Sequence, residues 1–544
     1  MMRLMARPVA LALLLCAPTA SGGIEYKFRG RELPMDVDLW SHLMVGHWLS
    51  AVQKREWHAK IAARLELSGA ALLTKAEDGT LEAFFSQGGS TVQFDRGMGQ
   101  QGMALPKAPT SGAAAQADLA AIVDGIQALQ RACAADSRCG AASTARRAGR
   151  ALLAIDWGSS ELRTMAESML WGELIGDAIG MPTMWFYSPP KDVIGAFGRE
   201  GVTGFAPPPE LHPTNTLMAD FYANNREHVR EVVGSVILHG KQELWQKKNV
   251  HYHAGLRAGE NTLNAQLLRV LLRASSGGDG YSPRSWLEAY AKFMTTEGSH
   301  NDSYADTAHV QFFYRFSQGT PLEECGGDEN HSTANIGALY ALVVLLLASA
   351  PGAAAGVEAG GEGAAAAEQV LAAVRGHVAL THRSPKLARY ASLLATLLLE
   401  LLSGTPLRTA LRTAGAELGI DLPAVAAIAP PADGQLPPAF SDLPVMVSHG
   451  RLQTTVLAGL RLHTVGAALS QAKGFGLSCY VHDSLPAVLY LAYKYAEPSQ
   501  ASQALLANTN VGGNTVHRGA ILGAILGAVS LHPSAGLAMP TTER

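Results

Sequence analysis

Apolar residues recur every three or four positions along most of the chain, the spacing that places them on one face of an α-helix. This spacing predicts helices over residues 39–67, 119–132, 141–153, 161–175, 220–246, 258–273, 286–293, 302–316, 336–348, 368–378, 385–402, 407–418, 452–472 and 485–495, and over the residues after 514. Alternating apolar and polar runs are scarce, apart from a weak hairpin signal within residues 72–94. The pattern therefore predicts an all-α protein.

The last of these helices carries a regular series of small residues. Gly519, Gly523 and Gly527 recur at every fourth position, which places them on one face. A glycine inside a helix costs about 1 kcal/mol relative to alanine, so the series indicates another backbone packed very close to this face. Asn514, just before the helix, is expected to cap it with its side chain.

Polar residues gather where this helix begins, namely Asn510, Asn514, His517 and Arg518. The free amides of a helix N-terminus attract anions, and an arginine beside them adds a positive charge. We therefore expect Arg518 and the helix amides to contact a phosphate group.

Composition narrows the class of protein. Of the 544 residues, 48% are hydrophobic and 16% are charged, which is typical of a globular protein with large buried surfaces. The formal net charge is −3 and aromatic residues make up 7%, so neither a basic field nor a set of stacking rings points to nucleic acid.

The first residues have the layout of a secretory signal. Arg3 and Arg7 precede an apolar run over residues 8–17, and small residues follow it. We predict a signal peptide over residues 1–22 and a secreted or lumenal protein; a buried N-terminal helix and an uncleaved anchor are the alternatives. The apolar stretch 338–350 is shorter than a membrane span, so no stable span is expected after cleavage.

The rest of the chain divides into two predicted regions. Residues 23–158 contain no motif that indicates a catalytic or binding site, and we interpret them as a mainly helical accessory region. Within it, Cys133 and Cys139 could form a disulfide in an oxidising compartment. Residues 159–544 contain every candidate motif. Within them, residues 351–367 are almost all Ala, Gly and Glu, which is typical of a flexible low-complexity surface loop.

Two acids and an imidazole are predicted to share one helix face. Asp302, Asp306 and His309 fall at i, i+4 and i+7, so they could hold a divalent cation or position a water. A solvated polar face with Asp302 as the N-cap is the alternative. Asp328, His331 and Asn335 repeat the pattern at i, i+3 and i+7, again with a structural alternative.

Three further polar positions stand at predicted helix starts. Glu260 and Asn261 precede an apolar helix, where a carboxylate is favoured by the helix dipole alone. His382 lies in a turn before Pro385, and Asp483 precedes a helix that it could cap. Structural and functional interpretations are both open at these positions.

Four segments together resemble the motifs of the ADP-ribosylglycohydrolase family, which includes the dinitrogenase-reductase-activating glycohydrolases. Residues 176–182, GDAIGMP, are similar to its opening Gly-Asp-Ala-x-Gly motif. Residues 259–262, GENT, stand where the family has Thr-Asp-Asp-Thr, and residues 381–382 resemble its Thr-His motif. Residues 510–517, NVGGNTVH, resemble its closing Asn-x-Gly-Gly-Asp-x-Asp-Thr segment.

This resemblance spans about residues 165–530 and implies a compact, orthogonal bundle of many helices. The family cleaves the glycosidic bond at the anomeric carbon of ADP-ribose, and a pair of magnesium ions organises the ribose hydroxyls and a water. Oxygen ligands suit magnesium, and two neighbouring ions polarise water and sugar oxygens. By resemblance the metal ligands would be Glu260, Asn261, Thr262 and Asn514. The substrate contacts would be Asp177, Asn261, His382, Gly513, His517 and Arg518.

The sequence departs from the family pattern at the metal positions. Glu260 and Asn261 replace the paired acids of the first metal motif, while Asn514 and Val516 replace those of the closing motif. His517 replaces the final threonine, so four metal carboxylates have become one. The expectation that follows is weak magnesium binding, no magnesium, or a supply of acids from elsewhere.

Several functions are consistent with these residues. The first is a divergent hydrolase that cleaves an N- or O-glycosidic bond of ADP-ribose or a related ribosyl substrate, with Glu260, Asp302 and Asp306 as catalytic residues. The second is an inactive protein that keeps an ADP-ribose or nucleotide pocket, and a metal-independent glycosidase with two carboxylates is a third. We expect a monomer whose partner is a small molecule or an ADP-ribosylated substrate. Convergence of the acids with Asn514 on one pocket would favour the hydrolase.

Overall fold

The structure is a computed structural model of the chain. It describes residues 140–213, 232–276, 280–327, 334–357, 363–427, 437–446 and 475–530, together with residues 113–135 and shorter segments before residue 105. The predicted signal peptide, the side chains of Cys133 and Cys139, residues Asp328 and His331, and the predicted helix 452–472 lie outside what is described.

The chain forms two compact units, each held together by its own contacts. The first comprises Met1–Phe94, Gln100–Thr144 and Gly415–Ile420, and the second comprises Asp95–Gly99, Ala145–Ala414 and Asp421–Arg544.

The described elements that lie in or run into the first unit are short except for one helix. They are β1 (Lys27–Phe28), β2 (Arg31–Glu32), a π-turn (Trp48–Val52), α5 (Leu81–Phe85), β3 (Thr91–Asp95), β4 (Gln100–Ala104) and α6 (Ala113–Ala135). β1 and β2 pair antiparallel, and β3 and β4 form a second two-stranded sheet. The second hairpin begins at Thr91, inside the segment 72–94 in which the sequence predicted one, but its second strand lies beyond that segment. The predicted helix 119–132 lies inside α6.

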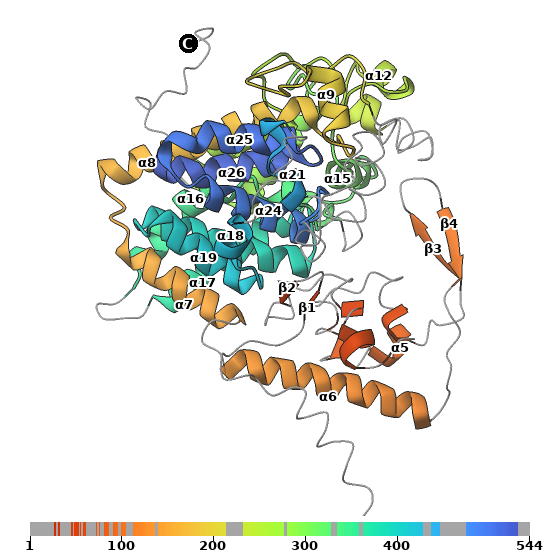
Figure 1. Cartoon of the computed structure of the whole chain (residues 1–544), viewed down its shortest axis with the longest axis vertical. Coiled ribbons are helices and arrows are strands. Elements are labelled where there is room, and N and C mark those ends of the chain that lie inside the picture. The colour runs from red at the N-terminus through yellow and green to blue at the C-terminus, as the bar shows by residue number, and fades with distance from the viewer. Residues whose placement is uncertain are drawn as a thin grey trace, which may run out of the picture. The chain divides into compact units, whose positions relative to one another are not determined.

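The second unit is built from helices, as Figure 1 shows. Its α-helices are α7 (Gly140–Ala154), α8 (Ser160–Gly180), α9 (Lys191–Phe197), α12 (Gln242–Gln246), α13 (Leu263–Ser275), α14 (Pro283–Thr295), α15 (Thr307–Ser317), α16 (Leu342–Ala355), α17 (Ala364–Ala379), α18 (Pro385–Leu402), α19 (Leu407–Glu417), α20 (Leu422–Ala426), α21 (Leu443–Met446), α24 (Val481–Lys494), α25 (Ala501–Asn510) and α26 (Thr515–Ser530). Short 3₁₀ or π segments are η3 (Met181–Thr183), η4 (Val232–Ile237), η5 (Leu322–Glu324), η6 (Ile336–Leu339), η7 (Pro438–Phe440) and η8 (Pro498–Gln500). The predicted all-α class is confirmed, with the two small hairpins as additions.

Helices α8 and α26 pack against each other through glycines. A Cβ atom on Gly519 would lie 2.3 Å from the carbonyl oxygen of Gly176, and one on Gly523 would lie 1.9 Å from that of Gly172. A Cβ on Gly527 would lie 2.4 Å from the carbonyl oxygen of Ser168. The predicted close approach of another backbone is therefore confirmed, and α8, which carries the opening motif, supplies that backbone (Figure 1).

One apolar stretch of the second unit is long enough to cross a membrane by length and composition. Ile336–Ala355, which joins η6 to α16, has 20 residues and a mean hydropathy of 2.0, so the prediction that it is too short is wrong. Within the structure, 61% of its most apolar window is buried, as in a core helix.

Helices also occupy much of the segment predicted as a flexible loop. α16 continues through Pro351 to Ala355, and α17 begins at Ala364. Alanine is the strongest helix former, so the alanine-rich ends of residues 351–367 extend the flanking helices instead of interrupting them.

Candidate functional site

The candidate site begins where α8 meets the start of α13. Asp177 Oδ1 accepts hydrogen bonds from Asn261 Nδ2 at 3.0 Å and from the Thr262 amide at 2.8 Å, and its Oδ2 accepts one from Thr262 Oγ1 at 2.6 Å. Burial raises the pKa of Asp177, and these hydrogen bonds oppose the rise. Asp177 therefore joins the opening motif to the Gly-Glu-Asn-Thr motif, and both of its oxygens are engaged in doing so.

Glu260 lies at the edge of this loop and forms a local ion pair. Its carboxylate accepts hydrogen bonds from the amide and guanidinium of Arg257, at 2.7 to 3.0 Å, and from Asn301 Nδ2 at 3.1 Å. Burial alone would raise the pKa of Glu260, but the hydrogen bonds and charge of Arg257 lower it overall. Neither Asp302 nor Asp306 shares a hydrogen-bond partner with this carboxylate among the contacts that the structure describes.

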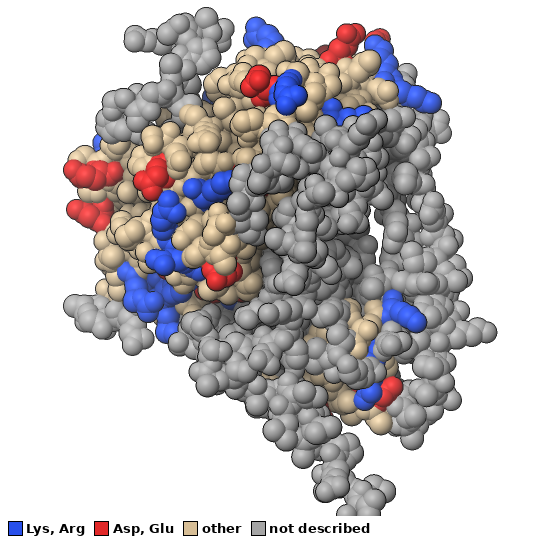
Figure 2. All heavy atoms as spheres, viewed as in Figure 1, with Lys and Arg blue, Asp and Glu red and all other residues tan. Residues whose placement is uncertain are grey.

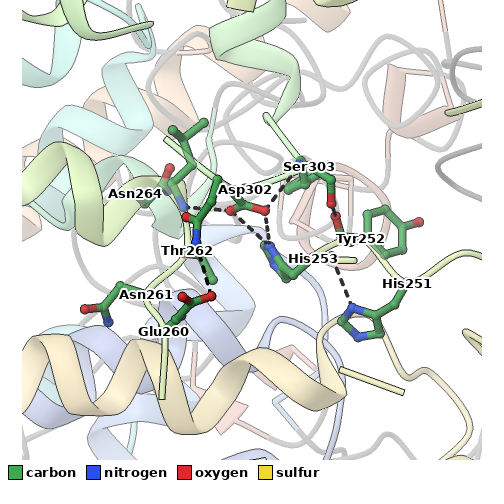
Figure 3. Close-up of polar contacts among 12 residues, drawn as sticks. His251, Tyr252, His253, Glu260, Asn261, Thr262, Asn264, Asp302 and Ser303 are labelled. Atoms are coloured by element: carbon green, nitrogen blue, oxygen red, sulfur yellow. Dashed lines mark hydrogen bonds and ion pairs between the residues drawn. The ribbon is translucent and has the colours of Figure 1, made fainter. Parts of the chain in front are cut away.

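Asp302 lies in the loop before α15 and caps a different helix. Its Oδ2 accepts from the Leu263 amide at 2.7 Å, so it satisfies the N-terminus of α13, whose own N-cap Thr262 bonds to Asp177. Its Oδ1 and Oδ2 lie 2.9 and 3.1 Å from His253 Nδ1. Figure 3 shows the carboxylate and the imidazole facing each other. The prediction that Asp302 shares a helix face with Asp306 and His309 is wrong, because the helix starts only after Asp306.

The pair formed by Asp302 and His253 is fully enclosed. Asp302 is 0% exposed and His253 is 2% exposed. Burial alone would raise the pKa of Asp302, but His253 and the amides of Leu263 and Tyr304 lower it overall, so the carboxylate is ionised. Such a carboxylate accepts the Nδ1 proton of His253, and Nε2 has no hydrogen-bond partner within the described part of the chain.

Asp306 is the N-cap of α15. Its Oδ1 accepts from the amides of Ala308 and His309 at 3.0 and 3.1 Å, while its Oδ2 has no partner among the described residues. Burial raises the pKa of Asp306, and the nearby His309, His382 and His517 more than offset this, so the pKa is lowered overall.

The start of α26 is capped as the sequence predicts. Asn514 Oδ1 accepts from the His517 amide at 3.3 Å, and both Asn514 and Val516 are fully buried. Gly513 pairs with Phe186 in an antiparallel bridge, donating to its carbonyl at 2.7 Å, and adopts a φ of 74° that favours glycine.

Arg518 is a structural residue in this arrangement. It is 0% exposed, donates from Nε to Asn508 Oδ1 at 3.0 Å, and donates from Nη2 to the Gly512 carbonyl. Burial lowers the pKa of Arg518 to about 10. Two of the guanidinium nitrogens hold the turn before α26, while Nη1 has no partner among the described residues, so the contact of Arg518 with a phosphate stays a prediction.

His382 lies in the turn between α17 and α18. Its Nδ1 is 2.8 Å from Thr381 Oγ1, and its Nε2 lacks a partner in the described ranges. Burial lowers the pKa of His382 to about 4, so the ring is neutral at pH 7. The prediction that Asp483 precedes and caps a helix is wrong, because α24 begins at Val481 with Tyr480 at the N-cap position. Asp483 lies in the first turn and accepts from Ser478 Oγ at 2.8 Å.

The four predicted metal ligands do not form a magnesium site. The carboxylate of Glu260 is paired with Arg257, Asn261 Oδ1 accepts from Arg269, and Thr262 Oγ1 donates to Asp177. The oxygen of Asn514 caps α26. No cluster of three or more His, Cys, Asp or Glu residues suitable for a metal ion occurs among the residues described. The donor set therefore does not fit the pair of ions that the family resemblance implies.

Two buried residues of this region were not singled out from the sequence. His253 is the last residue of a His-Tyr-His run, and nothing in its spacing points to Asp302. Glu173 lies four residues before Asp177, a spacing that places both on one face of the predicted helix. It is 2% exposed, its Oε2 has no partner in the described ranges, and burial, followed by the charge of Asp177, raises its pKa well above the usual value.

Comparison with known proteins identifies the family of this chain. A family model described as ADP-ribosylglycohydrolase matches residues 158–530, which is more than half of the chain. This chain belongs to the ADP-ribosylglycohydrolase family. A solved structure titled "ADP-ribosylglycohydrolase-related protein complex" is similar at 16% sequence identity and a TM-score of 0.34, covering 68% of this chain and 89% of that one. No curated protein matches the chain.

Proposed function

We propose that this protein is a divergent hydrolase of the family that cleaves a glycosidic bond of ADP-ribose or a related ribosyl substrate without a pair of magnesium ions. The observation that carries the proposal is the buried pair of Asp302 and His253, in which the carboxylate binds Nδ1 and leaves Nε2 without a partner among the described residues. An imidazole oriented in this way is a general base for water.

The chemistry needs one water and no metal. The water oxygen forms a bond to the anomeric carbon while one of its protons passes to His253 Nε2. The glycosidic bond breaks, and its electron pair goes to the leaving nitrogen or oxygen. That leaving atom takes up a proton, and His253 releases from Nε2 the proton that it accepted from the water, so charge and atoms balance. Asp302 is a positioning residue, because it keeps the proton on Nδ1 and stabilises the imidazolium.

Turnover of ADP-ribosyl-arginine and ADP-ribosyl-serine tests the proposal, with released ADP-ribose measured by chromatography. We expect equal rates in magnesium and in EDTA. His253→Gln should lower kcat by roughly 10²–10⁴-fold, the usual contribution of a general base. His239→Gln is the matched control, since the half-buried His239 bonds only to the Thr295 carbonyl among the described contacts. Turnover that requires magnesium and Glu260 would refute the metal-free mechanism.

A second function is favoured by the engaged metal-motif residues. The polar atoms of Asn261 and Thr262 are committed to protein contacts, so they do not hold the metal ions that the family uses for hydrolysis. In this second function the protein binds a ribosyl ligand without cleaving it. Calorimetry distinguishes this binding protein from the hydrolase. Binding of ADP-ribose that is insensitive to EDTA, with no product from either substrate, would establish binding alone.

The location and assembly of the protein remain proposals from the sequence. We propose a secreted or lumenal monomer whose residues 1–22 are removed as a signal peptide. N-terminal sequencing of the secreted protein and light scattering test these two points. On the face drawn in Figure 2, the basic and acidic side chains of the described residues lie in small groups separated by uncharged surface. From the low net charge of the sequence we propose that nucleic acid is not a partner.

A further inference from the structure

Four buried side chains from four different helices form one hydrogen-bonded chain. Tyr290 Oη of α14 lies 2.6 Å from His309 Nδ1 of α15, and His309 Nε2 lies 3.1 Å from Asn264 Oδ1 of α13. Asn264 Nδ2 lies 3.0 Å from Nε2 of His517, in the first turn of α26. All four residues are at most 7% exposed.

The direction of every bond in this chain is fixed by one carbonyl group. Asn264 Nδ2 also lies 3.2 Å from the carbonyl oxygen of Gly337, which can only accept. The amide must therefore turn its NH₂ group toward Gly337 and His517, and its oxygen toward His309. It follows that His309 donates from Nε2 and accepts from the Tyr290 hydroxyl at Nδ1, whereas His517 accepts at Nε2.

Both imidazoles are neutral, so each carries a single proton. Burial lowers the pKa of His309, and it lowers the pKa of His517 to about 4. Since the Nε2 atom of His517 is an acceptor, its only proton is on Nδ1. This Nδ1–H group is buried and has no partner among the described residues.

The surroundings leave room next to this donor. A Cβ atom built on Gly337 would lie 2.7 Å from His517 Nδ1, so the missing side chain keeps the space open. A cavity of about 10 Å³, enough for one water-sized group, is lined by residues that include His517, Gly337, Asn264 and Glu173. Asn514 Nδ2, also at the start of α26, is a second buried donor that lacks a described partner.

We propose that His517 determines ligand specificity by donating a hydrogen bond from Nδ1 to an oxygen of the ribosyl ligand. The ligand thus meets a donor at the position where the family pattern has a threonine of a metal motif. Asn264 is a positioning residue, because its amide, oriented by the Gly337 carbonyl, holds the tautomer of His517. The identity of the ligand rests on the proposed function, whereas the tautomer does not.

The tautomer is tested by NMR of the full chain labelled with ¹⁵N-histidine. We expect His517 to carry its proton on Nδ1. In the isosteric variant Asn264→Asp, a carboxylate accepts from both imidazoles, so the proton of His517 should move to Nε2. Tyr290→Phe removes a hydroxyl but keeps the Gly337 carbonyl that orients Asn264, so the proton of His517 should stay on Nδ1. This provides a second measurement if Asn264→Asp does not fold. A wild-type His517 protonated on Nε2 would overturn the inference.

Ligand specificity is tested with two variants of His517 and ADP-ribose as the probe. Nδ2 of asparagine is attached to Cγ, as Nδ1 of histidine is, so His517→Asn retains a donor at this position. His517→Gln places its amide nearer to the position of Nε2. We expect the Kd to change less than threefold in His517→Asn and to rise about tenfold in His517→Gln, the loss of one hydrogen bond.

The outcomes separate this inference from the proposed function. If wild type and His517→Gln bind ADP-ribose equally well, His517 has no role in specificity. If His517 carries its proton on Nδ1 but wild type does not bind ADP-ribose, the assignment of a ribosyl ligand and the specificity role of His517 are both wrong. Only the hydrogen-bonded chain of four side chains then stands, as a structural feature. If the Kd for ADP-ribose rises only in those of the four variants that lose the donor at the position of Nδ1, the inference and the proposed function are both supported.

Discussion

Replacing Gly523 by alanine tests how closely α8 and α26 approach. A Cβ atom on Gly523 would lie 1.9 Å from the carbonyl oxygen of Gly172 and 2.5 Å from its carbon, against an ordinary contact of about 3.4 Å. The obstacle is backbone inside a helix, so it cannot move aside as a flexible side chain would. The two helices must separate by more than about 1 Å over a buried length of α26.

The magnitude follows from two opposing effects. Overpacking a core costs about 1–3 kcal/mol, and a clash with rigid backbone belongs at the upper end of that range or above it. Alanine gains about 1 kcal/mol over glycine in helix propensity. We therefore expect Gly523→Ala to lower the free energy of unfolding by about 2 kcal/mol or more.

Gly376→Ala is the matched control for this substitution. Gly376 lies inside α17, is exposed, and a Cβ there would meet no heavy atom within 4 Å. At this position the higher helix propensity of alanine is not opposed by a steric clash, so Gly376→Ala should be slightly more stable than wild type. Urea unfolding followed by far-UV circular dichroism compares the midpoints. If the two variants shift the midpoint in the same direction by similar amounts, the close approach of α8 and α26 is refuted.

Two further stability predictions concern buried charge. In Arg147→Leu the carboxylate of Glu400 loses its bidentate partner, at 3.0 and 2.7 Å, and the free energy of unfolding should fall by about 3 kcal/mol. Arg408→Leu breaks an exposed ion pair and should lower it by under about 1 kcal/mol in the same urea assay. Equal losses in the two variants would contradict the prediction. His382 and His517 have folded pKa values of about 4, below the unfolded value of 6.5, so the unfolded state binds more protons in acid. Stability should fall as pH drops from about 6.5 to about 4, by about 3 kcal/mol per imidazole, and a urea midpoint that stays constant over this window would contradict it.

The helices that the sequence predicted well are those with local start and stop signals. The prediction for residues 385–402 matches α18, Pro385–Leu402, where Ser384 caps the helix and a proline stands at its first position. Asn514 likewise caps α26 as expected. These signals lie within a few residues of the element they define, so they can be interpreted without knowing the fold.

The predicted face of Asp302, Asp306 and His309 failed for a local reason. Helical spacing applies only to residues inside a helix, and Asp306, with a φ of −70° and a ψ of 171°, is still extended. The side chain of Asp302 therefore points back to α13 instead of along α15. Aspartate is a preferred N-cap residue, so Asp302 and Asp306 could each precede the helix. The sequence offers no basis for choosing which of the two does.

The candidate site could not be predicted because its contacts are distant in the sequence. His253 and Asp302 are separated by 49 positions, and Asn264 and His517 by 253. Periodicity assigns each of these residues to a helix or a loop, but it does not say which loops meet. The family resemblance indicates the order of the motifs and the positions of the family's metal ligands, but none of these motifs contains His253.

Electrostatics links the substitutions in the two metal motifs. Asn514 and Val516 are 0% exposed, and carboxylates at these positions would each lose several kcal/mol of hydration with no cation to compensate. Under the proposed metal-free mechanism, neutral residues are the stable choice at such buried sites. Glu260, the one acid that is kept, lies at the edge of the site and has its own arginine. The pattern of replacements is thus what burial requires of a site whose remaining polar groups serve as neutral donors and acceptors.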